Sequence, residues 1–346
     1  KRSPLETYEA VLAACLDGTI VSTCGTIIAA DLGGLSLYSW MFTAYMLCET
    51  IAIPIGGKLS DLYGRKPFFL LGMTLFLGGS IAAGLSNSME MFIICRAVQG
   101  AGGGILIPVA TAAIADLYSP IERGKMQGVM GAVFGLGTAL GPVIGGFITD
   151  YISWHWVFYL NVPLAALALF FTARQFPSIE VIHRKRIDYT GMSVLGLFLL
   201  DLLLFFTWAG NDFDWISMES GIMVAVAAAL LGLFVLVEYR AEDPVIAPRL
   251  FKNRTFVCGA FSMLVFGLAL TGALAYLSMF SIFIFGLTSR EAGYLTIAMV
   301  AGLMITAMCG GRYVQRTGYR PWVIMGPVIA CIAMTLMSTL GLGDSV

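Results

Sequence analysis

Three ionisable residues lie within apolar stretches of the sequence that are each long enough to cross a bilayer. Asp17 lies in the first stretch, Glu49 in the second and Arg96 in the fourth. An ionised side chain in hydrocarbon costs at least about 2.5–3.5 kcal/mol, so each must face a partner or a water-filled cavity. Desolvation favours the neutral form of a carboxyl group, which lets it bind and release a proton, whereas arginine keeps its charge. We therefore predict that Asp17, Glu49 and Arg96 form a site for proton exchange or for a cationic ligand.

Asp17 and Arg96 also have a structural interpretation. Asp17 is followed by hydroxyl-bearing residues and could serve as a hydrogen-bond partner within its own helix. Arg96 could be anchored to backbone carbonyl groups of the first stretch. A further acid, Asp201, lies in a later apolar stretch, and there we favour a structural or snorkelling role.

A charged loop follows the second apolar stretch and is repeated later in the chain. Residues 57–67 read Gly-Lys-Leu-Ser-Asp-Leu-Tyr-Gly-Arg-Lys-Pro, and residues 311–321 repeat their glycines, the proline and several cations, with Gln315 in place of Asp61. The repeat predicts two halves of similar build. We expect Asp61, Arg65 and Lys66 to form a latch, meaning an ion-paired contact that holds one conformation. The alternative is a solvated turn.

The fifth apolar stretch has small residues and a proline at close spacing. They are Gly137, Gly141, Pro142, Gly145 and Gly146. Glycines four residues apart let helices approach closely, and a proline permits a kink. The pattern favours a gate at a helix interface, and the alternative is ordinary glycine-mediated packing.

The composition excludes a soluble protein. The 346 residues are 58% hydrophobic and 12% charged, with a mean hydropathy of +0.87, whereas soluble domains are about 25% charged. The formal net charge of −1 gives no reason to expect a nucleic-acid partner. The seven cysteines all fall in apolar stretches without metal-ligand spacing. No phosphate-binding glycine loop is present, so we do not expect ATP to be the energy source. No nucleophile–base or metal constellation is present either, so we expect neither an enzyme nor a metal site.

Apolar windows of about 20 residues predict an all-α membrane protein. Eleven spans are expected, at 10–29, 36–57, 68–85, 91–114, 123–148, 154–174, 189–208, 220–238, 255–285, 291–312 and 322–342. Eighteen of the 20 Lys and Arg residues then fall on one side of the membrane, so the positive-inside rule predicts a cytoplasmic N-terminus. The last residues, 341–346, resemble an outer turn.

Five motifs, in order along the chain, resemble those of the major facilitator superfamily and, within it, the fourteen-helix drug:proton antiporter branch. Leu16–Val21 is similar to L-D-x-T-I-V, and the loop at Gly57–Lys66 to G-x-L-x-D-x-x-G-R-K. Arg96–Gly102 is similar to R-x-x-Q-G-x-G, and Gly137–Gly146 to G-x-x-x-G-P-x-x-G-G. Trp154–Pro163 resembles W-R-W-I-F-x-I-N-x-P, with His155 in place of the usual arginine.

The resemblance implies the major facilitator fold, with two six-helix bundles and two linker helices. We expect an N-terminal bundle at 1–176, a cytoplasmic loop with the linker helices at 177–254 and a partial C-terminal bundle at 255–346. Because the repeated loop would end the second helix of the second half, the sequence is expected to lack about three C-terminal helices. In the family the arginine at the position of Arg96 is tied to proton transfer. The aspartate at the position of Asp61 reaches the opposite bundle, on a helix expected in the absent part.

The resemblance also implies a function. We expect a proton-coupled exporter (antiporter) of amphipathic or cationic lipophilic compounds that works by alternating access, that is, a multidrug efflux transporter. It would be a multi-pass monomer in the plasma membrane, bound by lipid, with protons and a small amphipathic substrate as partners. It would use the proton gradient and no cofactor. The alternatives are a transporter of lipids or metabolites with the same fold, or a non-transporting membrane scaffold or receptor.

Overall fold

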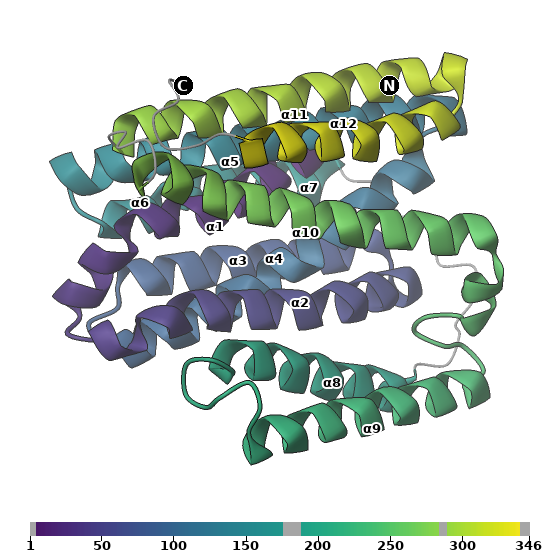
Figure 1. Cartoon of the computed structure of the whole chain (residues 1–346), viewed down its shortest axis with the longest axis horizontal. Coiled ribbons are helices and arrows are strands. Elements are labelled where there is room, and N and C mark those ends of the chain that lie inside the picture. The colour runs from purple at the N-terminus through teal and green to yellow at the C-terminus, as the bar shows by residue number, and fades with distance from the viewer. Residues whose placement is uncertain (1–4, 176–187, 284–288, 340–346) are drawn as a thin grey trace. The chain divides into compact units, whose positions relative to one another are not determined.

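The computed structural model describes residues 5–175, 188–283 and 289–339, and within these ranges the chain is almost entirely helical (Figure 1). The α-helices are α1 (Leu5–Asp31), α2 (Tyr38–Tyr63), α3 (Arg65–Gly84), α4 (Met89–Leu117), α5 (Pro120–Tyr151), α6 (His155–Tyr159), α7 (Asn161–Gln175), α8 (Tyr189–Trp208), α9 (Met218–Arg240), α10 (Arg254–Phe283), α11 (Ser289–Thr317) and α12 (Arg320–Thr339). Two short 3-10 helices, η1 (Leu35–Leu37) and η2 (Pro248–Lys252), precede α2 and α10.

The described helices follow the predicted spans. Eight helical segments are long and apolar enough to cross a membrane, among them α3, α4, α5 and the combined α6–α7. The first predicted span lies on α1, which is bent by 63° between Val11–Val21 and Thr23–Asp31 and would be a ninth span. The second lies on α2, which contains Glu49 and is not among the eight, and the last lies on α12, where Arg320–Leu336 is a shorter apolar helix. The expected all-α membrane fold is confirmed.

Several sequence expectations fall outside the described residues. They concern the terminal cations Lys1 and Arg2, the basic residues Arg184, Lys185 and Arg186 of the predicted cytoplasmic loop, and the predicted outer turn at 341–346.

The chain divides into two compact units, each described here by itself. Unit 1 comprises residues 1–116 and 140–248, and unit 2 comprises residues 117–139 and 249–346. Unit 1 therefore holds both α1–α4 and the pair α8–α9, which were expected to be linker helices. The division into 1–176, 177–254 and 255–346 stays a prediction.

Glycines on α4 bring the backbones of unit 1 into contact. A Cβ at Gly100 or Gly104 would collide with the backbone carbonyl of Tyr45 or Glu49 on α2, and one at Gly102 would collide with the backbone of Phe76 on α3. No residue larger than glycine fits there without moving a neighbouring helix. This close approach fixes the height of Glu49 on α2 relative to α4.

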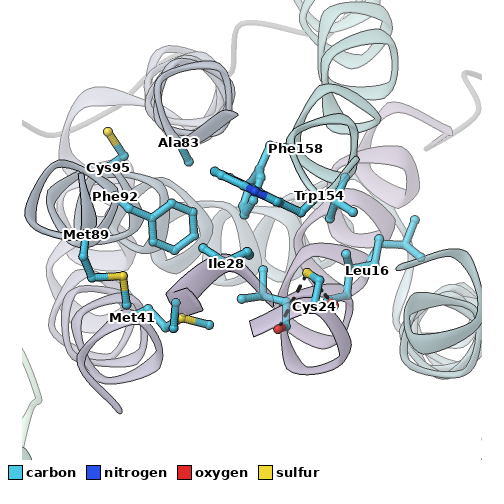
Figure 2. Packing of buried hydrophobic residues seen from close by; sticks show 14 residues of the cluster. Leu16, Cys24, Ile28, Met41, Ala83, Met89, Phe92, Cys95, Trp154 and Phe158 are labelled. Carbon is cyan, nitrogen blue, oxygen red and sulfur yellow. Dashed lines mark hydrogen bonds between the residues drawn. The ribbon is translucent and has the colours of Figure 1, made fainter. Parts of the chain in front are cut away.

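An apolar cluster packs beside the C-terminal part of α1. Figure 2 shows Phe92 of α4 turned toward Trp154 and Phe158, with ring-centroid distances of 5.9 and 5.4 Å and nearly perpendicular planes. Leu16 and Ile20 of α1 belong to the same cluster, and both are buried. Because these residues flank Asp17 in sequence, the cluster lies next to Asp17 on α1.

The α8–α9 pair packs on α2 within unit 1 (Figure 1). The rings of Trp40 on α2 and Trp208 on α8 meet edge to face at 6.3 Å. Both helices have side-chain N-caps: Asp188 accepts from the backbone N–H of Gly191 at 2.8 Å, and Ser217 accepts from that of Ser220 at 3.1 Å. These caps replace backbone hydrogen bonds that a helix start lacks.

In unit 2, the first half of α5 packs closely on α11. Its glycines 124, 128, 131 and 135 recur every three or four residues and therefore share one helix face. A Cβ at Gly128 would lie 2.8 Å from the carbonyl oxygen of Ala307, and one at Gly135 would lie 2.7 Å from Cγ of Met304. Sequence reasoning missed this second glycine series, although its spacing was visible.

Candidate functional site

Asp17 lies in a buried polar network within unit 1, together with Arg96. Nη1 of Arg96 is 2.5 Å from Oδ2 of Asp17. Oδ1 of Asp17 accepts two more hydrogen bonds, from Nε2 of Gln99 at 2.8 Å and from Nδ2 of Asn161 at 2.9 Å. Each of the four residues is 1% exposed or less. The carboxylate thus has a cation on one oxygen and two amide donors on the other.

Arg96 is held on more than one side. Its Nη1 also donates to Oε1 of Gln99 at 2.7 Å, and its guanidinium carbon lies 4.2 Å from the ring centroid of Tyr45. A cation over an aromatic face is attracted by the ring quadrupole, and more so when it is desolvated. Arg96 therefore links α1, α2 and α4 at one point.

Glu49 lies close to this ion pair but in a different environment. It is half-buried and makes no hydrogen bond within the described part of the chain. A methyl group at Gly103 of α4 would lie 3.0 Å from Oη of Tyr45 and 3.8 Å from Oε1 of Glu49, so these two polar groups face the same surface of α4. The charges of Arg96 and Asp17 both act on Glu49. Two acids thus share one arginine, which only Asp17 contacts directly.

The predicted gate residues of α5 divide into those that contact α1 and those that do not. A Cβ at Gly141 would collide with Thr19, and one at Gly145 would lie 2.6 Å from Oγ1 of Thr23. By contrast, a Cβ at Gly146 would have nothing within 4 Å. Pro142 lies inside the unbroken helix α5, and Gly137 is buried. Gly141 and Gly145 therefore let α5 pack against the helix that holds Asp17, and their gating role stays a prediction.

At the end of α2, Arg65 joins three helices. It pairs with Asp61 of α2, its Nε lies 2.9 Å from Oδ2 of Asp116 at the end of α4, and its Nη1 donates to Oγ of Ser60 at 2.7 Å. Lys66 lies elsewhere, because its Nζ donates to the carbonyl oxygen of Ala173 on α7 at 2.8 Å. The structure thus brings Asp61 and Arg65 together and places Lys66 at the C-terminal turn of another helix, where a cation is favourable.

Lys58 makes the longest-range contact of this loop, and sequence reasoning did not assign it a role. Its Nζ lies 3.1 Å from Oδ1 of Asp243 and donates to the carbonyl oxygen of Pro244 at 2.8 Å. Glu238 holds the same segment by accepting from the backbone N–H groups of Val245 and Ile246. Lys58 is 185 or more residues away from these partners in the sequence. The one sequence signal for the contact is the acidic pair after α9.

Asp201 and His155, which the sequence analysis also named, lie outside the polar network around Asp17. Oδ2 of Asp201, on α8, is buried and has no hydrogen-bond partner among the described residues. Nδ1 of His155 lies 2.8 Å from Oγ of Ser153, and its ring stacks on Trp154 at 3.7 Å between centroids. Among the residues that the structure describes, no group of three His, Cys, Asp or Glu side chains could hold a metal ion.

Comparison with known proteins places this arrangement in a family. A family model described as "Major Facilitator Superfamily" matches residues 10–346. The chain is 39% identical over 332 residues to "Multidrug resistance protein 3" of Bacillus subtilis, covering 95% of this chain and 64% of that protein. It is 37% identical over 338 residues to "Multidrug transporter protein MdtP" of the same organism, covering 97% of this chain and 62% of that protein.

Solved structures show the same fold at low sequence identity. The human organic anion transporter MFSD10 (TETRAN) aligns with a TM-score of 0.63 and 19% identity, covering 91% of this chain and 73% of that one. The proton:xylose symporter XylE aligns with a TM-score of 0.62 and 15% identity, covering 92% of this chain and 70% of that one. At these identities the likeness is one of fold.

Proposed function

Because the chain belongs to the major facilitator superfamily, as its motifs predicted, we propose that the protein is a proton-coupled exporter of amphipathic or cationic lipophilic compounds. Relatives named as multidrug transporters support export of such compounds. The chain spans under two thirds of the length of these relatives, so its own substrates and activity are part of the proposal. Nothing in the family or the site suggests an enzyme, in agreement with the sequence expectation.

The observation that carries the proposal is the contrast between two unequal acids near one arginine. Asp17 is sealed and bound to Arg96, whereas Glu49 is half-buried and lacks a hydrogen-bond partner within the described residues. A carboxyl group in a partly wetted position can be neutralised by a proton or by a cationic ligand, but not by both. Competition for the same carboxylate is the simplest physical basis of antiport, because binding of one cation releases the other.

In the proposed cycle, a proton enters at Glu49 from outside and favours reopening toward the cytoplasm. A cationic substrate then displaces the proton and favours the return to the outward state. The contact with Asp17 holds the guanidinium group of Arg96 near Glu49, and its positive charge limits how tightly Glu49 holds either cation. Close packing of Gly141 and Gly145 on α1 supports coupling of this site to movement of α5.

The proposal includes the cellular setting expected from the sequence. The protein would act as a monomer in the plasma membrane, with a cytoplasmic N-terminus and with the proton gradient as its energy source. The distribution of Lys and Arg between the two sides of the predicted topology supports this orientation.

Proton release on substrate binding tests the proposal. The purified full chain, in detergent and weak buffer with a pH-sensitive dye, is mixed with tetraphenylphosphonium. We expect acidification by the wild type, none by Glu49→Gln, and wild-type acidification by Asp201→Asn, a matched control that removes an intramembrane acid from α8. No acidification by the wild type with lipophilic cations would instead favour a transporter of lipids or metabolites, or a non-transporting scaffold.

A further inference from the structure

Asn161 occupies the junction between α6 and α7, inside the buried network. It belongs to the motif Trp154–Pro163, yet the transport scheme above gives it no role. Its side chain is 0% exposed, and its Nδ2 donates to Asp17 at 2.9 Å and to Oγ of Ser80 at 3.2 Å. It therefore connects the α6–α7 junction to both α1 and α3.

The backbone around Asn161 is fixed from outside its own helices. Pro163 has no N–H, so it leaves the carbonyl group of Tyr159 without its usual helical donor. On the preceding residue, the carbonyl oxygen of Phe158 accepts from Oγ of Ser80 at 2.9 Å. Ser80 thus holds both the end of α6 and the amide of Asn161, and the amide is positioned before Asp17 by α3.

Every group that contacts the carboxylate of Asp17 is a donor. Nη1 of Arg96 has no acceptor capacity, and the amide nitrogens of Gln99 and Asn161 only donate. Gln99 cannot reverse its amide freely, because its Oε1 accepts from Arg96 at 2.7 Å. Only the ionised carboxylate can accept all three hydrogen bonds, since a proton on Asp17 would face an N–H group.

Asn161 differs from the other two donors because its second polar atom is unused. Its Oδ1 is buried and has no hydrogen-bond partner among the described residues. The orientation of the amide is set by Nδ2, because the hydroxyl group of Ser80 donates its hydrogen to Phe158 and therefore can only accept from Asn161.

We propose that Asn161 is a positioning residue that stabilises Asp17 in its ionised form through the hydrogen bond from its Nδ2. The role deepens the proposed function, because it explains why Asp17 serves as a fixed charge beside the exchanging Glu49.

Other charged and titratable groups around Asp17 enter the same balance. Arg96 approaches from α4, Tyr45 and Glu49 act from α2, and Cys24 acts from α1 itself. The contacting groups from α3 and α7, Ser80 and Asn161, are uncharged. A change at Asn161 therefore alters hydrogen bonding to Asp17 without changing any formal charge.

Infrared titration of the purified full chain tests the proposal. The carbonyl stretch of a protonated carboxyl group is assigned to Asp17 as the band lost in Asp17→Asn. Replacing Asn161 by leucine removes one hydrogen bond to a charged group, so we expect the midpoint of this band to move to higher pH by about one unit. Ser80→Ala is the comparison variant: it loosens the amide but keeps the donor, so its midpoint should move by less than that of Asn161→Leu. An unchanged midpoint in Asn161→Leu would overturn the proposal.

A second variant covers the case in which Asn161→Leu fails to fold. Asn161→Asp keeps the shape but replaces the donor by a second carboxyl group, and two carboxylates in contact cannot both ionise. We expect a protonated-carboxyl band at neutral pH in addition to any that the wild type shows, and the absence of this additional band would contradict the proposal. The infrared readout needs no substrate, so the role of Asn161 and the export function can fail independently.

Discussion

The two acids near Arg96 differ in how many hydrogen bonds they accept and in how far they are buried. Asp17 accepts three hydrogen bonds and is 1% exposed, whereas Glu49 is half-buried and accepts none within the described residues. Both lie in predicted membrane spans of unit 1. An intramembrane carboxyl group can therefore be a fixed structural charge or an exchangeable one, depending on its hydrogen-bond donors. Four predictions test this contrast, beginning with the variant that should lose most stability.

Removal of Arg96 should have the largest effect. Arg96→Met leaves Asp17 buried without its counter-charge, and breaking a buried pair on one side costs about 3–5 kcal/mol. We expect a strong loss of thermal stability in detergent and no transport. The double variant Arg96→Met/Asp17→Asn should recover most of the stability, because no unpaired charge remains. It should not recover transport. A double variant as unstable as Arg96→Met would contradict the assignment of Asp17 as its partner.

Neutralising each acid separately should lower the stability of the two variants by different amounts but abolish proton release in both. Asp17→Asn replaces an acceptor by a group that must face an amide or guanidinium donor, which costs about 1–3 kcal/mol. Glu49→Gln disturbs no hydrogen bond within the described residues and should change stability by about 0.5 kcal/mol or less. Both should lose substrate-induced proton release, the first because Arg96 then holds Glu49 charged. Thermal unfolding measures the loss of stability, and the pH-sensitive dye measures proton release. Equal losses of stability in the two variants would contradict the contrast between the two acids.

The packing that seals Asp17 can be disturbed through α5. Gly145→Val should push α5 away from Thr23 and cost about 1–3 kcal/mol by overpacking, with a matching loss of transport. Gly146→Val is the matched control, since the added atoms meet open space, and it should behave like the wild type. Dye efflux from cells and thermal unfolding of the purified variants check this. Similar behaviour of the two variants would argue against a close α1–α5 contact.

The Lys58–Asp243 pair should show the smallest effect. Its side chains are 12% and 14% exposed, so it is more solvated than the Asp17–Arg96 pair and should contribute about 1 kcal/mol or less. Lys58→Asp should lower stability slightly, and the charge swap Lys58→Asp/Asp243→Lys should restore part of it. Thermal unfolding of the three variants is the measurement. A swap that is worse than either single change would show that the two charges do not interact.

The positions of the helices could be predicted from the sequence, but the hydrogen-bond partners of the buried polar residues could not. Long apolar windows fixed the spans, and the cost of a buried charge required a partner for Arg96, which Asp17 provides. No local pattern indicated that Gln99 and Asn161 would complete the shell of Asp17, because their contacts join residues 82 and 144 positions away from it.

Other differences have similar causes. Lys66 was grouped with Asp61 because the two are close in sequence, but at the start of α3 it reaches the carbonyl group of Ala173 instead. The five gate residues were treated as one unit, although Gly141 and Gly145 pack on α1 and Gly146 does not. Helix phase relative to neighbours decides such contacts, and a single sequence does not contain it.

An infrared difference spectrum recorded when tetraphenylphosphonium binds to the purified full chain tests the central contrast most directly. We predict that binding removes a protonated-carboxyl band and that this band change is absent in Glu49→Gln. A band change that persists unaltered in Glu49→Gln and disappears only in Asp17→Asn would show that the sealed acid exchanges the proton, and would contradict the account.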